Sequence, residues 1–135
     1  QYPQPTGNRC YNLGKAIRKA VESFPKDLNV VVFGTGGLSH QLQGERAGLI
    51  NVDYDINWLN QFVNDPESIK DTPHTEYIRE TGSEGIEAIM WLVMRGALQS
   101  NVDEVHRFTH APISNTHYAM TLLENTAERV TKKGR

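Results

Sequence analysis

The feature that most constrains the fold is a short apolar run, Leu28 to Phe33, that leads directly into a loop rich in glycine. The run lies between Pro25 and Gly34, two residue types that interrupt regular structure. A continuous apolar stretch of this length predicts a strand buried on both faces, as in a parallel or mixed sheet. The loop over 34–44 would then follow the carboxyl end of that strand, the edge at which open α/β sheets bind ligands.

The rest of the chain alternates between helical and strand-like patterns. Apolar residues at three- and four-residue steps predict helices over 10–24, 55–63, 66–70, 75–80 and 83–98. Alternating or β-branched segments predict strands over 101–110 and 116–123. Together these elements predict an α/β fold with a central mixed sheet flanked by helices. We expect one domain over 1–125, followed by a charged tail over 126–135 that frays.

Composition excludes several classes of function. The chain has 135 residues with 14 Lys+Arg and 16 Asp+Glu, a net charge of -2, so a basic nucleic-acid surface is not expected. No apolar run approaches the roughly 18 residues that a membrane span requires. The single cysteine, Cys10, excludes an internal disulfide framework and fits a reducing, cytoplasmic location. Because the sequence opens at Gln1 without an initiator Met, we expect a processed chain or a piece of a longer polypeptide.

The glycine-rich loop does not have the spacing of a nucleotide-binding loop. Gly34, Gly36 and Gly37 lack the third glycine of the dinucleotide fingerprint, and no Gly-Lys-Ser/Thr follows. The loop does contain His40, in a segment whose glycines let the backbone approach a ligand closely. A lone loop histidine is commonly a surface residue, but its place after a buried strand favours an acid/base role as the alternative.

Glu87 is the second unusual residue. It opens the most apolar segment of the chain, which continues as Ala88-Ile89-Met90-Trp91-Leu92-Val93-Met94. One interpretation is that Glu87 lies near the helix start, partly exposed and favoured by the helix dipole. Glu84, which follows the expected N-cap Ser83, fits that role better. The other interpretation is a buried carboxylate neutralised by an arginine or a metal ion.

The remaining histidines carry weaker signals. His106 and His110 are four residues apart in a predicted strand, so they share a face and a metal pair is conceivable. His74 and His117 have no partner at a diagnostic spacing, and we expect structural or solvated roles for them. Ser39 is adjacent to His40 and does not face it, so no Ser/His/Asp or Cys/His constellation can be assembled from the sequence.

Three separated motifs nevertheless resemble a known family. They are Gly34-Thr35-Gly36-Gly37-Leu38-Ser39-His40-Gln41-Leu42-Gln43-Gly44 with the following Arg46-Ala47-Gly48-Leu49-Ile50-Asn51, then Gly82-Ser83-Glu84-Gly85-Ile86-Glu87 leading into Met90-Trp91-Leu92, and Pro112-x-Ser114-Asn115-Thr116. In this order they resemble the catalytic beta chains of the protocatechuate 4,5-dioxygenases. These belong to the type II (class III) extradiol ring-cleavage dioxygenases, which also include gallate dioxygenases. The resemblance runs from about Tyr2 to about Glu124 and covers the carboxyl-terminal half of such a chain.

The resemblance implies a reaction and a set of site residues. The family opens a catechol-type ring beside its hydroxyls, using O2 and a non-haem Fe(II) held by two histidines and one glutamate. Glu87 matches the glutamate ligand, and His40 matches the acid/base histidine. Ser114 matches a residue near the substrate carboxylate, and Asn115 is expected to assist it. Two imidazoles and one carboxylate bind Fe(II) while leaving positions open for the diol and O2.

The same resemblance exposes a gap, because the two histidine ligands come from the amino-terminal half and no histidine precedes His40 here. We therefore predict that the isolated chain holds iron weakly and is inactive. The expected substrate is protocatechuate, cleaved at the 4,5 position. Gallate or another catechol is the alternative, and a non-catalytic binding or assembly module is a third possibility. A small alpha subunit that covers the site, and hence a hetero- or homo-oligomer, is implied by resemblance alone.

Overall fold

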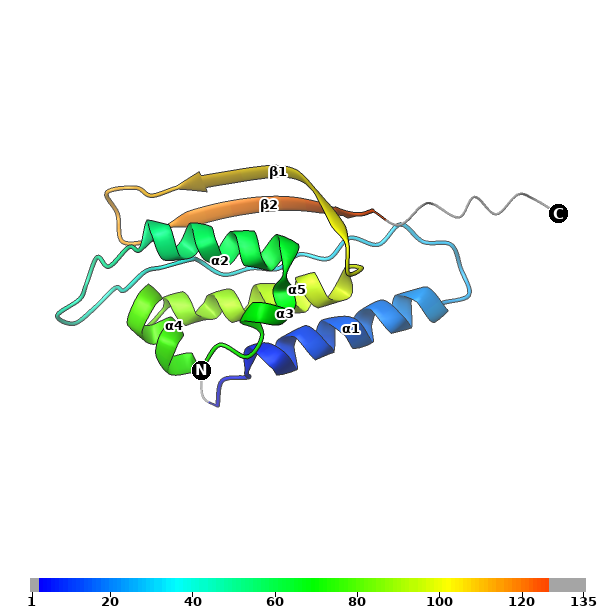
Figure 1. Cartoon of the computed structure of the whole chain (residues 1–135), viewed down its shortest axis with the longest axis horizontal. Helices are drawn as coiled ribbons and strands as arrows, with labels where there is room; N and C mark the ends of the chain where they lie inside the picture. Colours follow the sequence, from blue (N-terminus) through cyan, green and yellow to red (C-terminus); the bar gives the residue numbers. More distant parts are fainter. Residues whose placement is uncertain (1–2, 127–135) are drawn as a thin grey trace.

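The computed structural model of the chain describes residues 3–126. A pair of strands lies along one side of the molecule, and the helices lie on the other (Figure 1). The helices are α1 (Gly7–Ser23), α2 (Val52–Asn64), α3 (Pro66–Ile69), α4 (His74–Thr81), the 3-10 helix η1 (Gly85–Met90) and α5 (Trp91–Ala97). The strands β1 (Val102–His110) and β2 (Tyr118–Asn125) pair antiparallel. This arrangement confirms the α/β class and each predicted helix and strand after residue 50. Beyond Thr126, the predicted charged tail lies outside the described residues.

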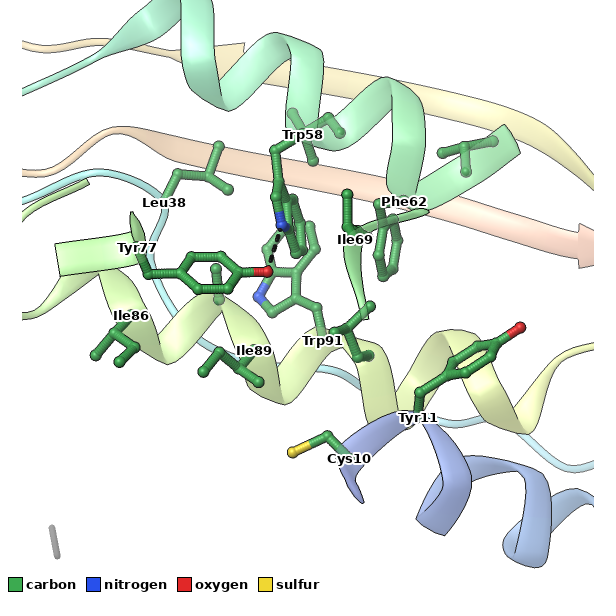
Figure 2. Packing of buried hydrophobic residues seen from close by; sticks show 14 residues of the cluster. Cys10, Tyr11, Leu38, Trp58, Phe62, Ile69, Tyr77, Ile86, Ile89 and Trp91 are labelled. Carbon is green, nitrogen blue, oxygen red and sulfur yellow. Dashed lines mark hydrogen bonds between the residues drawn. The ribbon is translucent and has the colours of Figure 1, made fainter. Parts of the chain in front are cut away.

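The core lies where α2, α4, η1 and α5 meet. Trp58 and Phe62 from α2 stack with ring centroids 5.3 Å apart, and the Trp91 ring meets both edge-on. Figure 2 shows the Trp58 indole directed at Tyr77, whose hydroxyl accepts the Trp58 Nε1–H at 2.9 Å. Aromatic side chains bury large apolar areas, so this cluster is expected to supply much of the stability of the fold.

Helix α1 packs directly on α5, which confirms the amphipathic helix predicted over 10–24. The two backbones meet at Gly14 and Gly96. A Cβ at Gly14 would lie 2.1 Å from the Val93 carbonyl oxygen, and one at Gly96 would lie 2.1 Å from the Tyr11 carbonyl oxygen. Only glycine permits this approach, because no larger side chain fits between the helices.

The prediction of a buried strand over 28–33 is wrong for the described part of the chain. The segment is an extended connection without ladder hydrogen bonds, drawn in cyan in Figure 1, and Phe33 is 85% exposed. The sheet that residues 3–126 form has two antiparallel strands, β1 and β2, which pair with each other. Within residues 3–126 the apolar run, although suited to a strand, has no neighbouring strand to bond to, because pairing requires a partner that local sequence does not supply.

The predicted helix over 83–98 is present but divided. It begins at Gly85 as the 3-10 helix η1 and continues as α5 from Trp91. Ser83 is not the N-cap, since its hydroxyl donates to the Glu84 carboxylate at 2.6 Å instead. None of the helices in residues 3–126 has the length and hydropathy needed to cross a membrane.

Candidate functional site

The glycine-rich loop folds against η1 and the start of α5. Gly36 has φ +137, and a Cβ there would lie 3.0 Å from the Glu87 carbonyl oxygen. The Gly36 carbonyl accepts the Trp91 Nε1–H at 3.0 Å. The glycines of the loop therefore permit a close approach to the η1 backbone, and the predicted close approach to a ligand stays a prediction.

His40 lies at the end of this loop and is 7% exposed. Its backbone N–H donates to the Thr81 carbonyl at 2.8 Å, and its carbonyl accepts the Gly85 N–H at 3.3 Å. Gly82, with φ +90, permits this junction, because a Cβ there would lie 2.4 Å from the His40 carbonyl oxygen. The end of α4 and the start of η1 thus hold the His40 backbone from both sides.

The His40 ring is oriented by two groups. Nδ1 lies 2.8 Å from the Leu38 carbonyl oxygen, and Nε2 lies 3.5 Å from Oε1 of Glu87. Because a carbonyl oxygen only accepts, Nδ1 carries a hydrogen. Nε2 is therefore the ring nitrogen that the Leu38 carbonyl leaves free, and it faces Glu87.

Glu87 differs from the buried carboxylate considered in the sequence analysis. Its side chain is 48% exposed, because Ile86, Ala88 and Ile89 occupy the core-facing side of the η1 turn. Oε1 accepts the Gly37 N–H at 2.6 Å and faces His40. Within residues 3–126, Oε2 makes no hydrogen bond, so it is the oxygen available to a cation.

A buried network that sequence reasoning missed lies behind the loop. The Asp55 carboxylate accepts the Ser39 backbone N–H at 3.0 Å, the Ser39 hydroxyl at 2.5 Å and the His117 Nδ1–H at 2.7 Å. All three residues are at most 1% exposed. The sequence did contain a signal for the burial of Asp55, because Asp55 lies on the same i, i+4, i+7 face of α2 as Leu59 and Phe62. The expectation of a structural or solvated role for His117 is confirmed on its structural side, and its partner Asp55 lies too far along the chain for sequence spacing to reveal it.

Ser114 and Asn115 lie in the exposed loop between β1 and β2. An isolated bridge between Thr116 and His40 brings this loop to the same end of the molecule as His40 and Glu87. No hydrogen bond within the described residues joins Ser114 or Asn115 to either of them. The structure therefore places the four predicted site residues at one end and brings two of them, His40 and Glu87, into direct proximity.

The other histidines form no site in the described part of the chain. His106 and His110 lie exposed on β1, and the His110 ring stacks on Phe108 with centroids 6.4 Å apart. His74 Nε2 lies 2.9 Å from the Pro5 carbonyl oxygen, which supports the structural role expected for it. Between residues 3 and 126, no group of three or more His, Cys, Asp or Glu side chains is arranged to hold a metal ion. Glu87 therefore offers one oxygen ligand, and the described residues do not complete a metal site around it.

Comparison of the sequence with known proteins identifies its family. The sequence model described as the catalytic LigB subunit of aromatic ring-opening dioxygenase matches residues 1–121. The gallate dioxygenase of Pseudomonas putida KT2440 is 47% identical over 125 residues, which are 93% of this chain and 36% of that protein. The chain thus spans about a third of the length of this relative. Because the family match covers nearly all of the sequence, the chain belongs to the LigB family of aromatic ring-opening, extradiol dioxygenases.

Proposed function

We propose that this chain contributes to an extradiol dioxygenase that opens the ring of gallate with O2. The observation that carries the proposal is the pairing of the His40 Nε2 with the Glu87 carboxylate at 3.5 Å, held by the Gly37 amide. Family membership supports ring opening, and the gallate dioxygenase relative favours gallate over the protocatechuate expected from the motifs.

In this proposal His40 is the acid/base residue. A buried imidazole whose Nδ1–H is committed to the Leu38 carbonyl keeps Nε2 for the substrate. Histidine changes charge near neutral pH, so Nε2 is suited to take a proton from a ring hydroxyl and return it later. The Glu87 carboxylate lies 3.5 Å from this Nε2 atom.

Glu87 would contribute one oxygen to a ferrous ion, through the Oε2 atom that the described residues leave unbonded. One carboxylate is too few donors for a stable Fe(II) site, and the family's metal chemistry uses two histidines as well. We propose that these come from polypeptide outside this sequence, as the greater length of the relative allows. Without them, the isolated chain is predicted to hold Fe(II) weakly and to be inactive.

Ser114 and Asn115 are proposed to bind the ring carboxylate of the substrate. Both side chains are exposed, carry hydrogen-bond donors and belong to the loop tethered to His40 through Thr116. A carboxylate held there would lie on the same end of the molecule as the proton acceptor. An association with a small alpha chain, as in related enzymes, remains a further proposal that co-purification followed by mass measurement would test.

The deciding experiment is an oxygen-uptake assay on the complete gene product, loaded anaerobically with Fe(II). We expect ring opening with a kcat/KM for gallate at least about 10-fold above that for protocatechuate, since hydroxyl recognition discriminates strongly. His40→Gln should lower kcat about 10²–10⁴-fold, whereas His106→Gln, on the exposed face of β1, should not change it. A preference for protocatechuate would overturn the substrate. Absence of ring opening in an iron-loaded protein would favour the non-catalytic module.

The prediction for the isolated chain needs a separate assay. An anaerobic Fe(II) titration of the 135-residue polypeptide, followed by oxygen uptake with gallate, should show weak metal binding and no ring opening. Robust cleavage by this chain would contradict the proposal that two ligands lie elsewhere.

A further inference from the structure

We propose that Asp55 is a positioning residue that sets the orientation of the His40 ring from behind the loop. This inference rests on the proposed function of His40. It concerns the network formed by Ser39, Asp55 and His117, which adjoins His40 through its chain neighbour Ser39.

The Asp55 carboxylate is the shared acceptor of the network. Asp55 is 1% exposed and accepts three donors, two from Ser39 and one from His117. The Ser39 hydroxyl in turn accepts the Asn51 N–H at 2.7 Å, at the N-cap of α2. A buried carboxylate persists only where donors replace its lost water. Here those donors belong to Ser39 of the glycine-rich loop and to His117, the residue that precedes β2.

These contacts reach His40 through the backbone. The Leu38 N–H donates to the His117 carbonyl at 3.2 Å, and the His117 N–H donates to the Ser39 carbonyl at 3.0 Å. The two peptide groups on either side of the 38–39 peptide are therefore fixed to His117, and the 38–39 peptide itself is fixed to Asp55 by the Ser39 N–H, with the Ser39 hydroxyl as a second contact. The carbonyl of Leu38, held in this way, is the group that accepts the His40 Nδ1–H. Movement of the 38–39 peptide would turn the ring away from its position facing Glu87.

The network of Ser39, Asp55 and His117 is not a catalytic triad. Ser39 is 0% exposed, and its hydroxyl hydrogen is directed at Asp55, so no substrate can reach its oxygen. A buried ionic group is also a poor means of gaining stability, because an apolar residue of similar volume often serves as well or better. Asp55 instead fixes the conformation of the loop at Ser39, and thereby the position of the adjacent His40.

The central test is Asp55→Asn, which keeps the size of the side chain but replaces one acceptor with a donor. In the 135-residue chain, long-range 1H–15N NMR should show loss of the single His40 tautomer with Nδ1–H, and the Ser39 amide should exchange faster with solvent. In the iron-loaded complete gene product, kcat and kcat/KM for gallate should fall together by about 10-fold or more, as expected for a misplaced base. Asp53→Asn removes the same charge two residues earlier on the exposed face of α2 and should change none of these readouts.

Two further variants separate positioning from stability. His117→Asn keeps a side-chain N–H donor near the position of Nδ1 and should retain most activity, although it leaves a cavity. His117→Leu has no donor and should behave like Asp55→Asn. If Asp55→Asn does not fold, Ser39→Ala decides the question, because it removes one of the same hydrogen bonds from a small side chain.

The inference is overturned if a folded Asp55→Asn or Ser39→Ala variant keeps the His40 tautomer and the wild-type kcat. It is likewise overturned if His117→Asn and His117→Leu lose activity only in proportion to their loss of stability. Failure of the proposed function has a different signature, because the wild-type gene product would then not open the ring, while the NMR measurements on His40 would still report on positioning.

Discussion

The Nε2 atom of His40 lies 3.5 Å from Oε1 of Glu87, and that oxygen also accepts the Gly37 N–H at 2.6 Å. The glycine-rich loop and the 3-10 helix η1, which are distant in sequence, thus meet at the pair proposed as the acid/base residue and a metal ligand. The two oxygens of Glu87 differ, because Oε1 is held by the loop and Oε2 has no hydrogen bond within the described residues.

The close approach at Gly37 predicts a sensitive position. A Cβ there would lie 3.0 Å from Cε1 of His40 and 3.1 Å from Cγ2 of Thr116, so Gly37→Ala should displace the ring by a few tenths of an ångström. We expect kcat of the complete gene product to fall about 3- to 10-fold, since small misplacements of catalytic groups are costly. Gln43→Ala, at an exposed position in the same loop, is the control. Equal kcat for both variants would argue against a role for the His40 orientation.

Replacement of Glu87 should separate metal binding from stability. Glu87→Gln is expected to lower the iron content of the complete gene product and to reduce ring opening at least about 100-fold, because a neutral amide is a weaker ligand than a carboxylate. Its half-exposed side chain predicts a stability change within about 0.5 kcal/mol. Metal analysis and thermal unfolding should be compared with Glu45→Gln, an exposed glutamate in the loop that follows His40. Normal iron content in Glu87→Gln would exclude Glu87 as a ligand.

The aromatic cluster should dominate stability. Phe62 is 0% exposed and stacks on Trp58, so Phe62→Ala is expected to cost about 3–5 kcal/mol of unfolding free energy. Phe24 is 52% exposed at the C-cap of α1, and Phe24→Ala should cost less than about 1 kcal/mol. Urea denaturation of the 135-residue chain measures both. Similar costs for the two variants would contradict the location of the core.

Glu84 should make stability depend on acidic pH. The Ser83 hydroxyl holds the pKa of the Glu84 carboxyl below its usual value, and the Leu42 N–H contributes in the same direction. A pKa lowered on folding stabilises the protein above the pKa of the unfolded state, about 4.3, and this contribution disappears as the pH falls through the lower folded pKa.

Ser83→Ala removes the larger cause of this shift. Carbon-13 NMR titration of the Glu84 carboxyl should therefore show its pKa rise towards the ordinary value. The difference in stability between wild type and Ser83→Ala should shrink as the pH is lowered. An unchanged Glu84 pKa in Ser83→Ala would show that the hydroxyl is not responsible.

The sequence alone determined the elements whose signals are local. Helices α1 and α2 and strands β1 and β2 follow from the spacing of apolar residues, because 3.6- and two-residue periods decide which face can be buried. The residues next to His40 and Glu87 in the sequence also marked these two as candidate site residues, and the motifs around them indicated the family. One of the two interpretations of Glu87 was a buried carboxylate, but its side chain is half-exposed. An apolar run does not reveal which side of a short 3-10 helix faces the core.

The tertiary structure decided whatever depends on partners far along the chain. The segment 28–33 has the composition of a strand but is not one within residues 3–126, because a strand exists only when another lies beside it. The hydrogen bond between Asp55 and His117 joins residues 62 positions apart, and no periodicity connects them. Local sequence fixes which backbone conformations are favourable, whereas the meeting of a buried carboxylate with its donors depends on how α2, the glycine-rich loop and the start of β2 pack together.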